Sequence, residues 1–176
     1  MPYHHGDLRR TLLDTALLAV AEHGPAGLSL RDVARRAGVS HAAPAHHFGD
    51  KTGLLTVLAV EGWTLLAEAL EAQGDDFRGQ GVAYVVFATG HPGHSAVMRA
   101  PGLVRDDDET LTAARDRAGD ALQAAAAGSG GDATTALAGW ALVHGLSALL
   151  LEGSVQPEPG QDVADLARAV TGELGG

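Results

Sequence analysis

The segment Leu28–Lys51 constrains the fold more than any other part of the chain. Ser29 precedes apolar residues spaced three and four apart, which predicts a short amphipathic helix. Ser29 and Asp32 form a variant of the capping box at the expected start of this helix. Gly38 stands where a left-handed residue would end this helix, and Ser40 can begin another. Two short helices joined by a turn of about three residues are typical of a helix-turn-helix.

The second of these helices, expected from about Ser40 to His47, has almost no large side chain. Small residues let a backbone approach another surface closely, and the first residues of such a helix meet base edges in the major groove. Lys51 opens the next helix, where a cation and free backbone N–H groups favour phosphate. We expect eight DNA-binding residues, namely Arg31, Ser40, His41, Ala42, Ala43, Ala45, His46 and Lys51.

Pro44 lies inside this expected second helix. If Ser40 is the cap, residue 44 is the first whose N–H would bond back to the Ser40 carbonyl, and proline has no such donor. We therefore expect a tight, 3₁₀-like first turn, or a helix start shifted by a residue or two.

The motifs resemble the TetR family of bacterial transcriptional regulators. The matching pattern is the capped helix followed by Gly38-Val39-Ser40, His47-Phe48, Asp50-Lys51 and Leu54-Leu55. The chain departs from it at Ala45, where the family commonly has a tyrosine that touches DNA phosphate, and at Pro44, where leucine is frequent. The resemblance implies a homodimeric regulator, usually a repressor, that leaves a palindromic operator when a small-molecule effector binds.

The distribution of charge matters more for DNA binding than the net charge of −10. Residues 1–52 carry six Lys or Arg against five Asp or Glu, a balance of +1, together with six of the nine histidines. Residues 53–176 carry six basic against seventeen acidic side chains, a balance of −11. We therefore expect DNA to be kept at the amino-terminal part of the chain.

Several functional classes lack the residues that they need. The absence of cysteine excludes disulfides, thiolate metal sites and a cysteine nucleophile. There is no GxSxG elbow, P-loop or dinucleotide fingerprint, so we expect no catalytic residues, no cofactor and no enzyme. His91 and His94 could bind a metal, but three or four donors are usually needed, and Pro92-Gly93 between them favours a helix-ending turn. His4 and His5 could touch the DNA backbone or remain unordered.

Apolar periodicity predicts an all-α fold of about nine helices. Beyond the helix-turn-helix, helices are expected at about residues 7–23, 50–73, 76–91, 95–99, 106–127, 133–152 and 162–174. We divide the chain into a DNA-binding domain of residues 1–50 and an effector-binding and dimerisation domain of residues 51–176.

Residues 133–151 contain no charged side chain and approach the length of a membrane span, about 20 residues. Their flanks carry no Lys or Arg to set a topology, so we favour a buried interface helix over a span. The amino terminus lacks the apolar core of a signal peptide, which predicts a cytoplasmic protein without membrane contact. The expected dimer interface comprises Leu137, Leu142, Leu146, Leu149, Leu150, Leu166 and Val170, and the alternative is that these residues form the core of a monomer.

Trp140, His144 and Gly145 form a W-x₃-H-G pattern in which Trp140 and His144 share a helix face. The pattern resembles a signature of one TetR subfamily. The expected effector pocket comprises Trp63, Phe87, Met98, Trp140 and His144, a mostly apolar lining that favours an apolar or aromatic ligand. His144 could bond an effector, or bond a backbone carbonyl in the core while Gly145 lets helices approach. The competing class of function is a helical ligand-binding or protein-interaction module without specific operator binding.

Overall fold

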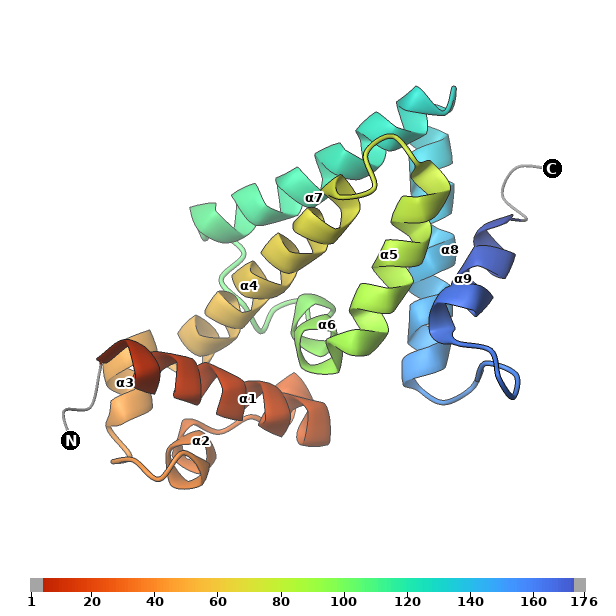
Figure 1. Ribbon diagram of the computed structural model, residues 1–176. Coiled ribbons are helices and arrows are strands. Elements are labelled where there is room, and N and C mark those ends of the chain that lie inside the picture. The colour runs from red at the N-terminus through yellow and green to blue at the C-terminus, as the bar shows by residue number, and fades with distance from the viewer. Residues whose placement is uncertain (1–4, 173–176) are drawn as a thin grey trace. The chain divides into compact units, whose positions relative to one another are not determined.

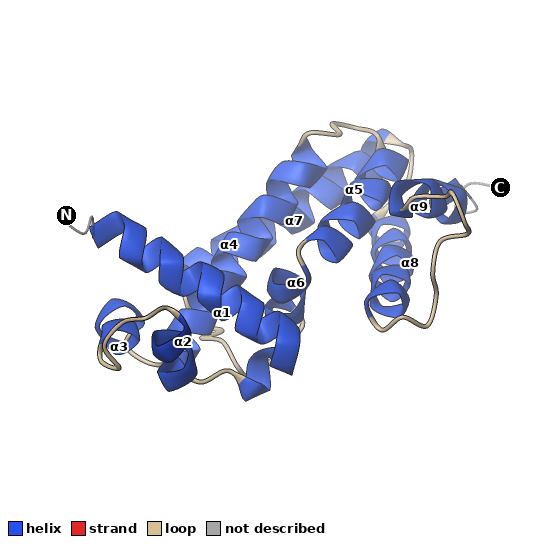
Figure 2. Ribbon diagram, turned by 60° about the horizontal axis from the view of Figure 1, so that its bottom comes forward, coloured by secondary structure: helices blue, strands red, loops and turns tan. Residues whose placement is uncertain are grey.

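The computed structural model describes residues 5–172, and every regular element in that range is a helix (Figures 1 and 2). The expected all-α fold is confirmed. The described helices are α1 His5–Gly27, α2 Leu30–Arg36, α3 Ala43–Phe48, α4 Lys51–Glu71, α5 Phe77–Gly90, α6 Pro92–Met98, α7 Glu109–Gly128, α8 Ala133–Leu151 and α9 Val163–Gly172.

The helices form two compact units. The first unit comprises residues 1–62 and 93–112, and the second comprises residues 63–92 and 113–176. The division falls inside α4, between Gly62 and Trp63, and it groups α6 with the amino-terminal helices. These packing units therefore differ from the functional division at residue 50, which stays a prediction.

In the first unit α1 packs against α2, and α2 packs against α3. Gly93 seats α6 against α1, because a Cβ at this position would lie 2.8 Å from the carbonyl oxygen of Leu17. Arg10 of α1 donates to Glu61 of α4 at 2.9 Å and also pairs with Asp14. Burial lowers the pKa of Arg10, but the hydrogen bonds to Asp14 and Glu61 outweigh it and leave the pKa raised. The ion pair therefore joins α1 to α4.

The carboxyl end of α2 forms as expected, but its amino end does not. Ser29 is the N-cap, but its side chain makes no capping hydrogen bond, so the expected capping box is wrong. Asp32 instead accepts hydrogen bonds from Arg35 and Arg36, which draw its carboxylate away from the helix start. At the other end Gly38 is left-handed, with φ of 69°, as expected.

The hydrogen bonds around Gly38 form a Schellman motif. The Gly38 N–H donates to Arg35 O at 3.3 Å, and the Val39 N–H donates to Ala34 O at 3.0 Å. These bonds satisfy two carbonyls that the end of α2 would otherwise leave open.

The start of α3 is shifted toward its carboxyl end, as Pro44 predicted. The helix begins at Ala43 with Ala42 as its cap, and Pro44 occupies the first turn, where no N–H is needed. The Ala43 N–H donates to Ser40 O at 3.0 Å, which is a 3₁₀-like turn before the helix. Residues 37–42 therefore separate the two helices, so the expected three-residue turn is too short.

In the second unit α5 packs against both α8 and α9 (Figure 1). The buried core between these helices comprises Val85, Val143, Leu146 and Ala167. Asp132 and Thr135 form a capping box at the start of α8, in which the Asp132 carboxylate accepts from the Thr135 N–H at 3.0 Å.

Helix α7 lies beside the carboxyl-terminal half of α4 in both ribbon views, and the Arg117 Nε donates to Glu71 Oε1 at 2.7 Å across this contact. The hydrogen bond from Arg117 holds the pKa of Glu71 below its ordinary value. The contact joins α7 to α4, and together with α5, α8 and α9 these helices supply the walls of a cavity.

Three predicted boundaries are wrong by a few residues. Helix α1 was expected to end at residue 23, but it extends to Gly27 across a kink at Gly24, where the backbone is not helical. Helix α6 begins at Pro92 rather than Ser95, because proline fits the first position of a helix and His91 alone separates it from α5. Helix α7 begins at Glu109, because the carboxylate of Asp108 accepts from the Leu111 N–H at 2.9 Å and caps the helix.

Candidate nucleic-acid interface and ligand cavity

Helix α3 and the turn before it present small and polar residues to solvent. Ser40, His41, Ala42, Ala45 and His46 are exposed, and Ala43 is half-buried. Two larger residues of the helix face inward instead, since Pro44 is buried and Phe48 is 7% exposed. The outer face is therefore nearly free of bulky side chains, which is what close approach to a groove requires.

The arginines of α2 differ in whether an acid neutralises them. Arg35 and Arg36 both pair with Asp32, and Arg36 also pairs with Glu22 at 2.7 Å. The hydrogen bond from Arg35 is the main cause that lowers the pKa of Asp32. Arg31 is exposed, and no hydrogen bond or ion pair is found for it in the described part of the chain. Arg31 thus carries the uncompensated positive charge of this helix.

Lys51 is half-buried, and its Nζ donates to Ala26 O at 2.6 Å. A carbonyl is not a counter-charge, so the ammonium group remains available to attract phosphate. The free N–H groups expected at the start of α4 are partly used, because the Gly53 N–H donates to Asp50 at 2.7 Å.

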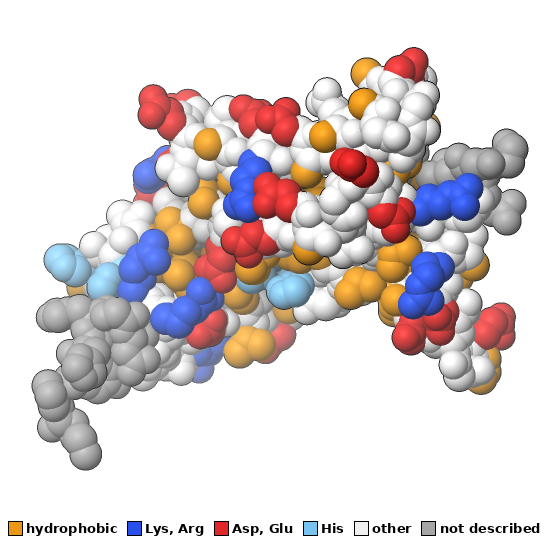
Figure 3. Space-filling model, turned by 45° about the horizontal axis from the view of Figure 1, so that its top comes forward, with side chains coloured by type: hydrophobic (Ala, Val, Ile, Leu, Met, Phe, Trp, Pro, Cys, Tyr) orange, Lys and Arg blue, Asp and Glu red, His pale blue; other side chains and the backbone are white. Residues whose placement is uncertain are grey.

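Arg105 donates to Asp50 at 3.0 Å, which sequence reasoning missed because the two residues are far apart in the chain. The Gly53 N–H is the main cause that lowers the pKa of Asp50, with Arg105 adding to it. In Figure 3, histidine side chains lie beside basic side chains at the left of the view. His4 and the side chain of His5 lie outside the described residues.

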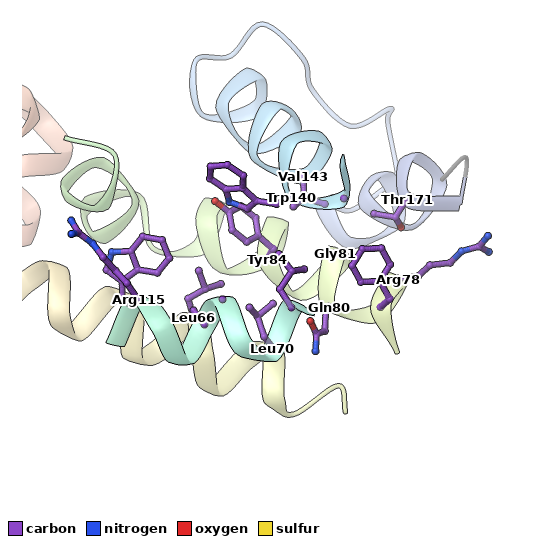
Figure 4. A pocket seen from close by; sticks show the side chains of 16 residues that line it. Leu66, Leu70, Arg78, Gln80, Gly81, Tyr84, Arg115, Trp140, Val143 and Thr171 are labelled. Atoms are coloured by element: carbon purple, nitrogen blue, oxygen red, sulfur yellow. The ribbon is translucent and has the colours of Figure 1, made fainter. Parts of the chain in front are cut away.

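A cavity of about 190 Å³ lies within the second unit (Figure 4). Its walls come from α4, α5, α7, α8 and α9 and are mostly apolar. The lining residues are Trp63, Leu66, Leu70, Phe77, Arg78, Gln80, Gly81, Tyr84, Arg115, Ala118, Gly119, Leu122, Gly139, Trp140, Val143 and Thr171.

The structure brings together two of the five expected effector residues. Trp63 and Trp140 both line the cavity. Phe87 is not among the lining residues, and its ring stacks on His91 with centroids 4.8 Å apart. Met98 belongs to the first unit, where its Sδ lies 2.7 Å from the place a Cβ would take on Gly62. These positions explain why an apolar residue type alone did not identify the lining.

His144 lies behind the cavity wall. Its Nδ1 is 2.9 Å from the hydroxyl of Tyr84, which lines the cavity, and its ring lies 5.2 Å from that of Trp140. Figure 4 shows Tyr84 and Trp140 next to each other. A Cβ on Gly145 would meet no described atom within 4 Å, so the close helix approach falls at Gly139 instead, against the ring of Phe77.

The expected dimer residues divide into two groups. Leu137 and Leu149 of α8 are 58% and 43% exposed, and Leu142 is half-buried. Leu146 was expected in the dimer interface, but it is 8% exposed and belongs to the protomer's own core. Three further expected interface residues pack against this core, namely Leu150, Leu166 and Val170. Helix α8 is apolar on all sides, so its sequence does not indicate which side faces the core.

Helices α4 and α8 are both long and apolar enough to cross a membrane by length and composition alone. More than half of the apolar window of α4 is buried inside the protein, compared with about a quarter for α8. Such helices are common in the cores and interfaces of globular proteins, so this finding is weak evidence of insertion.

The two histidines of the α5–α6 junction have separate surroundings. The Nδ1 of His91 lies 3.1 Å from Phe87 O, as in a helix end, and His94 is buried with its Nε2 3.4 Å from Glu61. Among the described residues no group of three or more His, Asp or Glu could hold a metal ion.

Comparison with family models finds two matches that cover most of the chain. Residues 12–58, which include the helix-turn-helix, match the model described as bacterial regulatory proteins, tetR family. Residues 77–174, which include most of the cavity wall, match the model described as tetracyclin repressor-like, C-terminal domain.

Named relatives are transcriptional regulators. The chain is 34% identical to the HTH-type transcriptional regulator BetI of Agrobacterium fabrum over 82 residues, 47% of this chain and 34% of BetI. It is 38% identical to the HTH-type transcriptional repressor AcnR of Corynebacterium glutamicum over 66 residues, 38% of this chain and 35% of AcnR. The chain therefore matches about a third of the length of these relatives.

A solved structure of a protein of unknown function from Rhodococcus sp. RHA1 is similar over nearly its whole length. It is 35% identical, with a TM-score of 0.76 over 99% of this chain and 96% of that chain. The likeness extends through the helices of both units.

Proposed function

Because the chain belongs to the TetR family of bacterial regulatory proteins, we propose that it is a dimeric transcriptional repressor that a small molecule releases from a palindromic operator. A repressor of this kind acts on chromosomal DNA, which places the protein in the cytoplasm. The observation that carries the DNA-binding part of the proposal is the outward face of α3, where Ser40, His41, Ala42, Ala45 and His46 are exposed.

The physical role of this face follows from its side chains. A run of alanines suits the methyl group of thymine, and His41 and Ser40 can form hydrogen bonds with base edges. Arg31 and Lys51 supply positive charge for phosphate, which positions the helix and adds affinity without reading sequence. Base recognition is thus assigned to α3, and phosphate binding to α2 and the start of α4.

The exposed apolar face of α8 supports the dimeric part of the proposal. Leu137 and Leu149 are both exposed on this helix, which carries no charge. Exposed apolar residues gathered on one helix mark an interaction surface. Pairing of this face across a two-fold axis buries it and sets two copies of α3 about one turn of DNA apart, roughly 34 Å.

The cavity in the second unit is the proposed effector site. Helix α4 contributes Lys51 to the DNA-binding face and Trp63 to the cavity wall, so one continuous helix takes part in both sites. Effector binding releases DNA when the effector prefers the conformation that does not bind DNA, with a coupling free energy of about 1 to 3 kcal/mol.

An electrophoretic mobility shift with DNA from upstream of the protein's own gene tests operator binding. We expect a specific complex at nanomolar protein. Lys51→Ala should weaken binding to all sequences alike, whereas His41→Ala should change the preference among operator variants. If wild-type protein binds operator and unrelated DNA equally, or neither, the chain is a helical ligand-binding or interaction module without operator recognition.

A further inference from the structure

Two buried polar atoms, in the side chains of residues that line the cavity, have no hydrogen-bond partner among the described residues. They are the side-chain oxygen Oε1 of Gln80 and the indole Nε1 of Trp63. The first can only accept a hydrogen bond, and the second can only donate one. Buried polar groups in proteins nearly always have partners, so each of these atoms indicates a complementary group on a ligand.

The orientation of the Gln80 amide is fixed by its other end. Its Nε2 donates to Gly74 O at 3.1 Å and to Ala121 O at 3.2 Å, and the residue is 2% exposed. A flipped amide would place its oxygen against these two carbonyl oxygens, so the nitrogen must be the atom that faces them. Both lone pairs of Oε1 are therefore left for a donor.

The acceptor and the donor lie toward opposite ends of the cavity. Trp63 and Leu70 are separated by seven residues of α4, a rise of about 10 Å. Gln80 lies at the Leu70 end in Figure 4 and is tied to Gly74, just beyond the end of α4. A single polar substituent on a ligand would therefore reach one of the two atoms and not both.

The cavity is suited to an uncharged molecule. Figure 4 shows the guanidinium groups of Arg78 and Arg115 at the two edges of the labelled side chains, pointing away from the middle. Leu66, Leu70 and Val143 line the space between. A cavity of about 150 Å³ holds benzene, so the volume of about 190 Å³ has room for one ring with small substituents.

We propose that the cavity binds a neutral single-ring molecule with a hydrogen-bond acceptor at one end, bonded by Trp63, and a donor at the other end, bonded to Gln80. This inference rests on the proposed effector role of the cavity and specifies the chemistry of the effector. Phenolic ketones and aldehydes with their two polar groups on opposite sides of the ring have this arrangement.

Four probes of nearly equal shape test the proposal by calorimetry on the full-length protein. 4-Hydroxyacetophenone has both groups, 4-methylacetophenone lacks the donor, 4-isopropenylphenol lacks the acceptor and 4-isopropenyltoluene lacks both. We expect 4-hydroxyacetophenone to bind most tightly, with a loss of about tenfold for each missing group. A purely apolar cavity would give the opposite order, because the probe without polar groups is the most hydrophobic.

Two matched substitutions assign the acceptor end. Trp63→Phe removes the indole N–H but keeps an aromatic ring, so it should abolish the advantage of 4-hydroxyacetophenone over 4-isopropenylphenol. The advantage over 4-methylacetophenone, which reports on Gln80, should persist. Trp140→Phe makes the same chemical change in another wall of the cavity and should preserve both advantages. Gln80 is probed through the ligands, because its amide also holds two carbonyls in place.

The proposal is overturned if no probe binds, if the four bind alike, or if Trp63→Phe preserves the advantage that depends on the acceptor. Operator binding measured on the same preparations separates this failure from failure of the regulator assignment. Operator binding without probe discrimination overturns the ligand chemistry alone. Probe discrimination without operator binding overturns the regulator assignment and leaves the cavity chemistry standing.

Discussion

The charge on Arg31 provides a quantitative test of the DNA-binding face. Arg31 and Arg35 lie one turn apart on α2, and both are exposed. Asp32 pairs with Arg35 and Arg36, whereas no acidic partner is found for Arg31 within the described residues. Replacing Arg31 with glutamine removes an uncompensated charge, and replacing Arg35 removes one that an acid already offsets.

The expected size of the effect follows from counterion release. Each phosphate that a cation neutralises contributes about 0.9 to the slope of log affinity against log salt. A two-fold dimer contains two copies of Arg31, so Arg31→Gln should reduce the magnitude of the slope by about 1.8. Between about 50 mM and 200 mM salt, the wild type should then lose roughly twelvefold more affinity than the variant.

Fluorescence anisotropy with a labelled operator, repeated at several salt concentrations, measures this slope. Arg35→Gln is the matched control and should change the slope by much less than Arg31→Gln. Thermal unfolding of both variants checks that α2 remains folded. Equal changes from the two substitutions, or no change from Arg31→Gln, would refute the reasoning that pairing with Asp32 decides which arginine meets phosphate.

Three further predictions concern the fold and its assembly. Gly38→Ala places a side chain at φ of 69° and should cost about 1 kcal/mol in urea unfolding; an unchanged midpoint would contradict the Schellman end of α2. Asp132, whose pKa the Thr135 N–H lowers below 3.8, should stabilise the fold above pH 3.8 and cease to do so as pH falls through its folded-state pKa. The stability difference between wild type and Asp132→Asn should therefore shrink in acid, and a constant difference would exclude the charge as its cause. Leu137→Glu and Leu149→Glu place charges on the exposed face of α8 and should yield folded monomers in sedimentation equilibrium, so dimers that persist in both variants would rule out this face as the interface.

Local physics determined much of what the sequence predicted correctly. The left-handed Gly38 and the shifted start at Pro44 depend on backbone sterics within a few residues, so they could be derived without a structure. The capping box at Ser29 failed although the motif was present. Its acidic member, Asp32, had two arginines within one turn, and its carboxylate pairs with their guanidinium groups, which carry a full positive charge, instead of with a backbone N–H.

The side of each helix that faces inward could not be predicted from the sequence. Leu146 and Leu149 stand three residues apart in a helix without charges, yet one lies in the core and the other is 43% exposed. The cavity posed the same difficulty, because its walls come from several helices. Gln80 carried no motif, and its importance appears only once Gly74 and Ala121 are seen to hold its amide.

The position of Trp63 links the ligand chemistry to the proposed regulation. Trp63 is the first residue of the second unit, and the preceding Gly62, at the end of the first, packs closely against Met98 of α6. A ligand that accepts a hydrogen bond from the indole thus acts on the turn of α4 at which the two units divide. A ligand held by apolar contacts alone would fill the cavity without favouring one position of that indole, and so would provide less of the differential affinity that release of DNA requires. The polar end of the effector, rather than its ring, is therefore the part on which regulation should depend.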